Sequence, residues 1–196
     1  MTSPSTALDL LADPDLIIRI AAGDHQAFTM LVNRHAEHYY RLAWRLLHHG
    51  ENAADIVQEA FLRLWQHPER YDGHRGSSFT TWFYRVVVNL CIDQQRKKKP
   101  EALEESYQPI AAGVNPEKLV AERQCHDCLA MMIQTLPVRQ KAAMTLCFYE
   151  ELSNQEAADI MGISLKALQS LLVRAKNALR QQYVAPEGGM GDHDEC

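Results

Sequence analysis

The 196-residue sequence predicts an all-α fold with two helical domains joined by a flexible linker. Apolar residues recur at spacings of three and four over most of the chain, and no convincing strand-like alternation is present. This periodicity stops between residues 100 and 116, where three Pro, three Glu and one Gly occur instead. We therefore expect residues 100–116 to link a first domain, residues 14–99, to a second, residues 117–184.

The first domain is expected to begin with a short helix from about Asp15 to Ala22. Gly23 breaks this helix, and Asp24 caps a long helix that continues up to Gly50. The long helix carries apolar and ring side chains at helical spacing, namely Phe28, Leu31, Val32, His35, Tyr39, Leu42, Ala43 and Leu46.

Two further helices complete the first domain. The segment from Asn52 to Trp65 repeats the apolar spacing, and a polar loop rich in turn-forming residues follows over residues 67–76. An aromatic-rich helix is expected from Ser78 to about Lys98. Its three successive valines would also suit a strand, but the length and the spacing of three and four favour a helix.

The second domain is expected to begin where Asn115 caps a helix that has Pro116 at its first position. This helix carries Leu119, Val120, Leu129, Met132 and Ile133. Another helix begins at Leu136-Pro137 and continues through Phe148. Residues 185–196 are polar and acidic, and we expect them to be disordered.

The strongest local motif begins at Ser153. Ser153 and Glu156 have the spacing of a capping box, which opens a short helix that ends at Met161. Gly162 suits the left-handed backbone conformation that ends a helix, and a last helix is expected from Leu165 to about Gln182. A short helix, a glycine turn and a second helix make a helix-turn-helix pattern.

The second helix of this pattern has an apolar and a polar side. Ala158 is small where the two helices would cross, and Ile163, Leu168 and Leu172 would pack inward. The outward side, which would face DNA, is formed by Lys166, Gln169, Ser170, Val173 and Arg174. A helical hairpin that only packs within the protein stays open as the alternative interpretation.

Charge is distributed unevenly along the chain. The formal net charge of −5 combines −2 over residues 1–14, +3 over residues 15–99, −3 over residues 100–124, +1 over residues 125–184 and −4 over the tail from residue 185. The first domain ends in the run from Arg96 to Lys99, which would bind phosphates or form a solvated helix end. The aromatic residues before this run would stack on unpaired bases or form the core of the bundle, and the pattern leaves both open.

Catalytic and metal-binding functions find little support. No nucleophile elbow, phosphate-binding glycine loop or HExxH motif is present, so we expect no catalytic residues, no metal and no cofactor. Cys125 and Cys128 are spaced for zinc binding or redox exchange, but there is no second cysteine pair. Two buried thiols on one helix face are a sufficient explanation.

The composition also favours a soluble, cytoplasmic protein. No window approaches 18 consecutive apolar residues, so no membrane insertion is expected. The N-terminus lacks the positive flank of a secretory signal, and the five cysteines are an odd number, which argues against a disulfide framework.

Taken in order, the motifs resemble those of extracytoplasmic-function (ECF) sigma factors, the smallest type of bacterial RNA polymerase initiation factor. DIVQEAFLRLW at residues 55–65 resembles the family's region 2.2, and FxxWFYRVxxNxxxDxxR at 79–96 resembles regions 2.3 and 2.4. LPxxxxxA at 136–143 and the helix-turn-helix ending in RAKxxLR at 174–180 resemble region 4. The resemblance covers roughly residues 14–183, and it implies a region 2-like bundle and a region 4-like helix-turn-helix domain.

The resemblance implies three binding surfaces. The helix 52–65 would dock on the clamp helices of the largest subunit of core polymerase through Asp55, Gln58, Glu59, Leu62 and Arg63. The next helix would read and open the -10 element and hold an extruded base near Asn89, with further contacts from Trp82, Tyr84, Arg85, Arg96, Lys97 and Lys98. The last helix would enter the major groove at the -35 element through Ser164, Lys166, Gln169, Ser170, Arg174 and Lys176.

The resemblance also implies regulation by an anti-sigma factor, a part in a stress response and no enzymatic activity of the chain itself. One departure concerns the last helix, because many family members have Arg where Gln169 and Leu171 stand here. Gln can pair with adenine, so either the -35 sequence differs from the common one or the affinity is lower.

Two other classes of protein compete with this hypothesis. A stand-alone helix-turn-helix regulator would bind DNA without polymerase, but it has no use for the polymerase-binding face of the helix 52–65. A helical metal or redox sensor would be built on Cys125 and Cys128.

Overall fold

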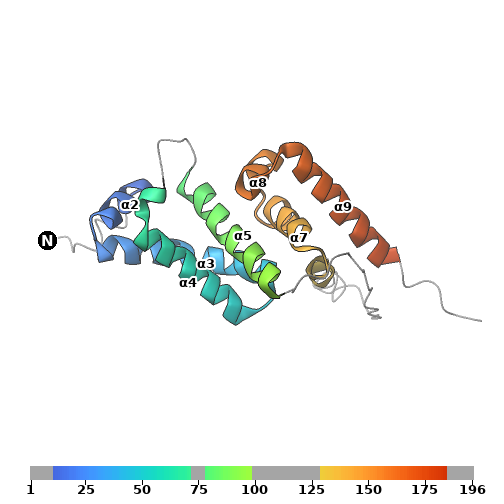
Figure 1. Cartoon of the computed structure of the whole chain (residues 1–196), viewed down its shortest axis with the longest axis horizontal. Helices are drawn as coiled ribbons and strands as arrows, with labels where there is room; N and C mark the ends of the chain where they lie inside the picture. The colour runs from blue at the N-terminus through green and yellow to red at the C-terminus, as the bar shows by residue number, and fades with distance from the viewer. Residues whose placement is uncertain (1–10, 72–77, 99–128, 185–196) are drawn as a thin grey trace, which may run out of the picture.

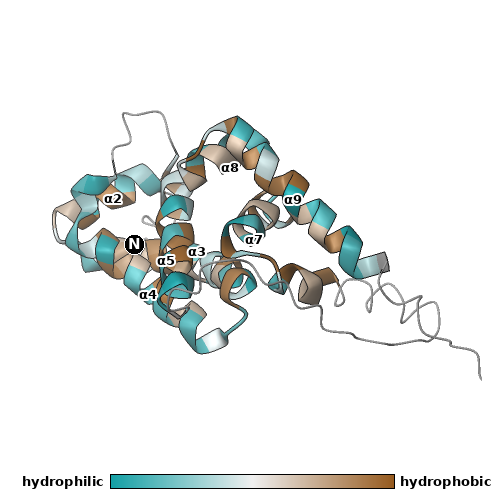
Figure 2. Ribbon diagram, turned by 45° about the vertical axis from the view of Figure 1, so that its right-hand side comes forward, coloured by the Kyte–Doolittle hydropathy of each residue, from teal (hydrophilic) through white to brown (hydrophobic). Residues whose placement is uncertain are grey.

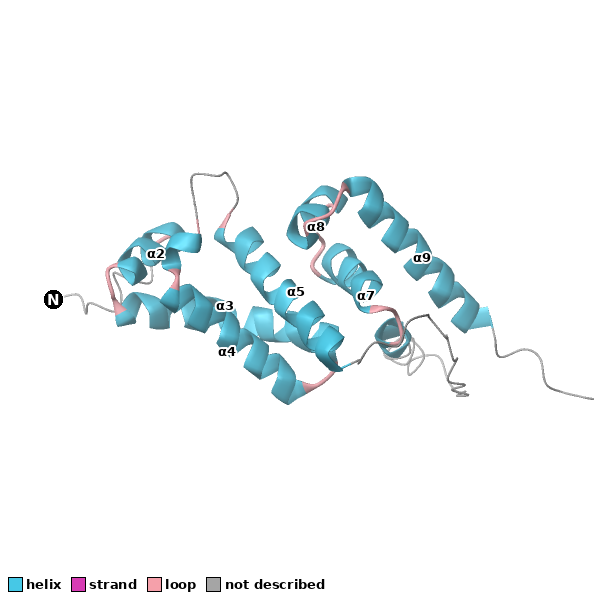
Figure 3. Cartoon of the chain, in the orientation of Figure 1, coloured by secondary structure: helices cyan, strands magenta, loops and turns pink. Residues whose placement is uncertain are grey.

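The computed structural model describes residues 11–71, 78–98 and 129–184. Over these residues every regular element is helical, which confirms the predicted all-α class (Figure 3). The linker at 100–116, the Cys125–Cys128 pair and the tail at 185–196 lie outside the described residues. Among the described helices, none combines the length and the apolar character needed to cross a membrane.

The described residues of the first half form four α-helices. They are α2 (Asp13–Ala21), α3 (His25–Leu47), α4 (Gly50–Gln66) and α5 (Phe79–Lys98), with a short 3-10 turn η1 (Pro68–Arg70) after α4. Each lies within a few residues of its predicted range.

The predicted cap of α3 is present. The Asp24 carboxylate accepts hydrogen bonds from the backbone N–H groups of Gln26 at 2.9 Å and Ala27 at 3.1 Å. The Ala27 N–H lowers the pKa of this carboxyl below its usual value, and the Arg19 guanidinium, 2.8 Å away, adds to the effect. The boundary between α2 and α3 is therefore fixed by local hydrogen bonds.

The second half contains α7 (Val138–Met144), α8 (Asn154–Met161) and α9 (Leu165–Val184). Residues 129–134 are also helical. The sequence predicts one helix from Leu136 through Phe148, but the α-helical turns end at Met144 and a π-helical turn, η3 (Thr145–Tyr149), follows. The Glu150 N–H donates to the carbonyl of Thr145 at 3.1 Å, five residues back. The apolar spacing is similar in both kinds of turn and does not reveal the wider one.

Helix α3 is the centre of the first half. It packs against α2, α4 and α5, and its side chains Leu31, Tyr39, Leu42 and Leu46 are almost completely buried. The Tyr39 hydroxyl donates to the carbonyl of Thr80 on α5 at 3.1 Å, so its polar atom is satisfied inside the core.

The two halves pack against each other. Helix α5 lies between the rest of the first half and the helices α7 and α8, and it contacts both of these (Figure 1). Helix α3 also contacts α7 and η3. Apolar residues, brown in Figure 2, face inward between the helices, and the buried residues of both halves form one cluster. The sequence predicts a flexible linker between the two domains, and it does not predict this contact between them.

Lys141 on α7 is buried beneath the C-terminal end of α3. Its side-chain ammonium donates to the Leu46 carbonyl at 3.3 Å and to the Gln134 side-chain oxygen at 3.0 Å. The residue is 5% exposed, and this burial lowers the pKa of Lys141 from 10.5 to about 8. A positive charge suits the negative end of a helix dipole, but removing it from water costs stability.

We predict that the stability contributed by Lys141 rises with pH above about 8. Between its pKa in the folded state and its pKa in the unfolded chain, the folded state binds fewer protons, so stability increases with pH. Relative to Lys141→Met, the wild type should gain on the order of 1 kcal/mol of unfolding free energy between pH 7 and pH 9. Urea denaturation of both chains at the two pH values measures this difference, and a constant difference would contradict the prediction.

Candidate functional site

Helix α4 presents the face predicted to bind polymerase. Asp55, Gln58, Leu62 and Arg63 are exposed, and Glu59 is half-buried. The Arg63 guanidinium donates to the Glu59 carboxylate at 2.8 Å, one helical turn away. Leu62 is 44% exposed, an unusual position for a large apolar side chain on an otherwise polar face.

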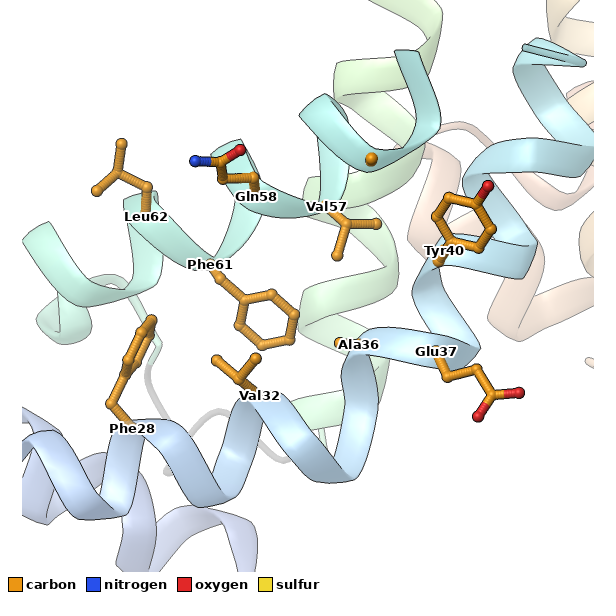
Figure 4. Close-up of a pocket in the computed structure, with 10 residues that line it drawn as sticks. Phe28, Val32, Ala36, Glu37, Tyr40, Val57, Gln58, Phe61 and Leu62 are labelled. Atoms are coloured by element: carbon orange, nitrogen blue, oxygen red, sulfur yellow. The ribbon is translucent and has the colours of Figure 1, made fainter. Parts of the chain in front are cut away.

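An apolar groove extends this face onto α3. It has a volume of about 610 Å³ and lies between α3 and α4 (Figure 4). Figure 4 shows side chains from both helices around it, and the lining consists of Phe28, Val32, Ala36, Glu37, Tyr40, Ala54, Val57, Gln58, Phe61 and Leu62. The groove contains Gln58 and Leu62, so the predicted polymerase-binding face and the groove form one continuous surface.

The groove was not predicted from the sequence. Phe28, Val32, Ala36 and Tyr40 are spaced by four, which places them on one stripe of α3. The core stripe runs instead through Leu31, Tyr39, Leu42 and Leu46. Separating the two sets would have revealed a second apolar side of the helix, which is only partly buried.

Helix α5 presents part of the surface predicted to bind the -10 element. Asn89, Arg96 and Lys97 are exposed, and Trp82 is half-buried, so these four share the solvent-facing side of the helix. Lys98 is the last residue of the helix, and its side chain is not among those that the structure describes.

The aromatic residues of α5 are mostly core. Phe79 is 2% exposed and Phe83 is fully buried, so the core interpretation holds for both. Trp82 lies at the edge of the hydrophobic core. Its ring centroid is 5.7 Å from that of Tyr71 and 6.2 Å from that of Phe79. Of the three aromatic residues considered, Trp82 alone is left with part of its ring accessible to a base.

Tyr84 and Arg85 lie at the contact between the halves. The Tyr84 hydroxyl donates to the Glu150 carboxylate at 2.8 Å, and Tyr84 is 8% exposed. Burial raises the pKa of Tyr84, and the Glu150 charge raises it further, so the hydroxyl keeps its proton. The Arg85 guanidinium donates to the carbonyl of Asp159 on α8 at 2.6 Å. The resemblance implies DNA contacts for both residues, and in the closed arrangement of the two halves both also contact the second half.

Helices α8 and α9 form the predicted helix-turn-helix. The Ser153 hydroxyl accepts from the Glu156 N–H at 3.2 Å, and the Glu156 carboxylate accepts from the Ser153 N–H at 2.9 Å, which completes the capping box. Gly162 has a φ of 63°, the left-handed conformation expected of it. Ala158 and Leu168 are fully buried, and Leu172 is nearly so.

The residues predicted to bind the -35 element share one exposed surface. All six are exposed, namely Ser164, Lys166, Gln169, Ser170, Arg174 and Lys176. The Ser164 hydroxyl caps α9 by accepting from the Ala167 N–H at 3.2 Å, and the Lys176 ammonium lies 5.2 Å from the centre of the Phe148 ring. The exposed side of α9 is therefore free to enter a major groove of B-DNA, which is wide enough for an α-helix.

The described residues hold no group of three or more His, Cys, Asp and Glu side chains that could bind a metal ion. Cys91 is a buried free thiol and Cys147 a half-buried one.

The two halves match two protein-family models. Sigma-70 region 2 matches residues 31–101, and Sigma-70 region 4 matches residues 126–179. A helical bundle followed by a helix-turn-helix with these matches defines the class of sigma-70-type transcription initiation factors.

Comparison with characterised proteins specifies the family. The chain is 33% identical to the ECF RNA polymerase sigma factor SigW of Bacillus subtilis over 177 residues, which cover 85% of this chain and 94% of SigW. It is 32% identical to the ECF RNA polymerase sigma-E factor of Escherichia coli over 181 residues, which cover 86% and 93% of the two chains. The chain belongs to the ECF family of RNA polymerase sigma factors.

The fold is also similar to solved structures. CnrH, solved in complex with the cytosolic domain of CnrY, has a TM-score of 0.63 and 23% identity, over 89% of this chain and 99% of that one. The sigma factor RpoE of Bartonella quintana, solved with the anti-sigma factor NepR, has a TM-score of 0.57 and 18% identity, over 82% and 98%. At these identities the likeness concerns the fold alone.

We predict that Gly162→Ala destabilises the helix-turn-helix through the backbone. A Cβ at this position would meet nothing within 4 Å, so the cost is that of placing Ala in the left-handed region, about 1–2 kcal/mol. Gly162→Asn should cost less, because Asn tolerates this conformation better. Chemical denaturation of the three chains tests the order Gly, Asn, Ala, and equal stabilities would contradict it.

Proposed function

We propose that this sigma factor binds core polymerase through the α4 face and its groove, reads the -35 element with α9 and reads and opens the -10 element with α5. The chain performs no chemistry of its own, and polymerase makes the RNA. The domain limits that go with these roles are residues 14–99 and 117–184. Its place of action is the cytoplasm, where bacterial promoter DNA and polymerase meet.

One observation carries most of this proposal. The α4 face and groove are exposed and apolar in part, although α4 packs on α3 and α5 within its own half. Exposed apolar area rimmed by polar side chains is typical of a protein-binding surface. A regulator that binds DNA alone would have no use for it, so the observation favours a sigma factor over a stand-alone helix-turn-helix protein.

We also propose an anti-sigma factor as a partner. The CnrH structure contains the cytosolic domain of CnrY, and the RpoE structure contains the anti-sigma factor NepR. The similar fold supports a similar kind of regulation here. Such a partner, added in equimolar amount, should suppress transcription that depends on this chain.

The proposed function is tested by run-off transcription. Purified chain is added to sigma-free bacterial core polymerase on a library of upstream DNA, with core polymerase alone as the control. Initiation at a discrete set of start sites only in the presence of the chain supports the proposal and yields both promoter elements. Specific duplex binding by the chain alone, without initiation, would favour the stand-alone regulator.

We predict that Leu62→Ala weakens binding to core polymerase about tenfold, the range of an apolar residue at the centre of an interface. Ile18→Ala is the matched control, because Ile18 is 68% exposed on α2, away from the groove. Affinities for core polymerase can be measured by fluorescence anisotropy. Equal affinities for the two variants would mean that Leu62 does not contribute to binding core polymerase.

We predict that Asn89→Ala weakens initiation that depends on the -10 element by about 1–3 kcal/mol, the worth of a good base contact, and leaves core binding unchanged. Asn177→Ala, an exposed amide on α9 outside the predicted contacts, is the control. Run-off yield and polymerase affinity are measured on the same preparations. An equal loss of both, or of neither, would exclude Asn89 from base reading.

A further inference from the structure

Helix α9 exposes a large apolar side chain in the middle of its outer side. Val173 is 58% exposed, and the other exposed large apolar residues among the described side chains of α9, Leu165 and Tyr183, lie at or near its two ends. Leu168 and Leu172, by contrast, pack inward and are 0% and 8% exposed. Packing within the described part of the chain therefore does not account for the valine at position 173.

Val173 belongs to the stripe of α9 that lies opposite the buried leucines. Lys166, Ser170, Val173 and Asn177 are spaced by four, three and four residues, and all four are exposed. Gln169 lies beside this stripe, one helical turn before Val173, and it is also exposed. From Ser170 to Asn177 the stripe carries no charge, so the middle of the outer side is neutral.

Positive charges border this neutral stripe. The sequence of α9 contains four Lys and Arg residues and no Asp or Glu. Arg174 lies on one side of the stripe, and Lys176 and Arg180 lie on the other, all of them exposed. A helix in the major groove has a phosphate strand on each side and base edges in front of it. The bordering charges therefore suit phosphates, which position the helix, while the neutral stripe faces the bases, which carry the sequence.

The chemistry of the neutral groups limits what they can read. The Ser170 hydroxyl donates to the Lys166 carbonyl at 2.9 Å, so its hydrogen is used within the helix. The Gln169 amide has no hydrogen-bond partner among the residues that the structure describes, which leaves its donor and its acceptor available. Such an amide pairs with both N6 and N7 of adenine, and an apolar side chain packs on the 5-methyl group of thymine.

We propose that Gln169 and Val173 determine the sequence of the -35 element, with Gln169 pairing to an adenine and Val173 packing on the methyl group of a thymine. This inference rests on the proposed function. The two residues are four positions apart, about 6 Å along the helix axis, so the two bases lie about two base-pair steps apart. Gln169 thus changes the preferred sequence rather than lowering the affinity.

The test is run-off transcription by core polymerase with the full chain, on a promoter recovered in the run-off experiment described above. Each base pair of its -35 element is replaced in turn by the other three, and each thymine also by deoxyuridine, which lacks only the methyl group. The variants are Val173→Ala and Gln169→Arg. Gln181→Arg is the control, because it adds the same charge to an exposed amide residue in the last turn of α9.

For Val173 we expect one thymine at which deoxyuridine lowers the wild-type yield about fourfold, the effect of one buried methyl group. Val173→Ala should initiate equally well on the two templates. A merely structural role of Val173 would not distinguish templates that differ in a single methyl group of the DNA. The absence of any such thymine for the wild type, or the same loss in Val173→Ala, would overturn the proposal.

For Gln169 we expect the wild type to prefer adenine at one position, about fivefold or more over the other bases, and Gln169→Arg to prefer guanine there. Gln181→Arg should keep the preference for adenine. An unchanged preference in Gln169→Arg, or the same change in Gln181→Arg, would overturn the proposal. If the wild type initiates at no discrete start site, the proposed function fails and this inference fails with it. Initiation without the expected base preferences overturns this inference alone.

Discussion

The C-terminal end of α3 is where the two halves of the molecule depend on each other. Its last carbonyls have no partners within the helix, and they accept from side chains of other elements instead. Gln134 donates to the Arg45 carbonyl at 2.8 Å, while Gln95 and Lys141 donate to that of Leu46. The Arg45 side chain, one residue from this end, pairs with Glu150. One helix terminus thus links α5, α7 and the turn after η3.

This constraint divides the proposed binding surfaces into two groups. The α4 face with its groove, and the outer side of α9, point away from the contact between the two halves. Both surfaces are therefore accessible to a partner in the closed chain. Helix α5 is different, because its exposed side carries Asn89, Arg96 and also Arg85, which donates to the Asp159 carbonyl of the second half. Tyr84, on another side of α5, is buried against Glu150. Closure therefore leaves polymerase binding possible and couples the -10 surface to the position of the second half.

Much of the fold could be predicted from the sequence, because its signals are local. The Asp24 cap, the Ser153–Glu156 capping box and the glycine turn at Gly162 each involve residues within a few positions of one another, and all three are present. Helical spacing alone predicted the exposure of Lys166, Gln169, Ser170 and Arg174. The contact between the two halves could not be predicted, because Tyr84 and Glu150 are 66 residues apart and no periodicity relates them.

The most direct test is the distance between the two halves of the chain, measured before and after it joins core polymerase on promoter DNA. Fluorophores at positions 93 on α5 and 155 on α8, both exposed, outside the proposed contacts and on helices that pack on each other, would report this distance by energy transfer. We predict efficient transfer in the free chain and a large drop when core polymerase and promoter DNA are added. Unchanged transfer in a complex that makes transcripts would contradict the account, because it would mean that the closed chain reads both elements.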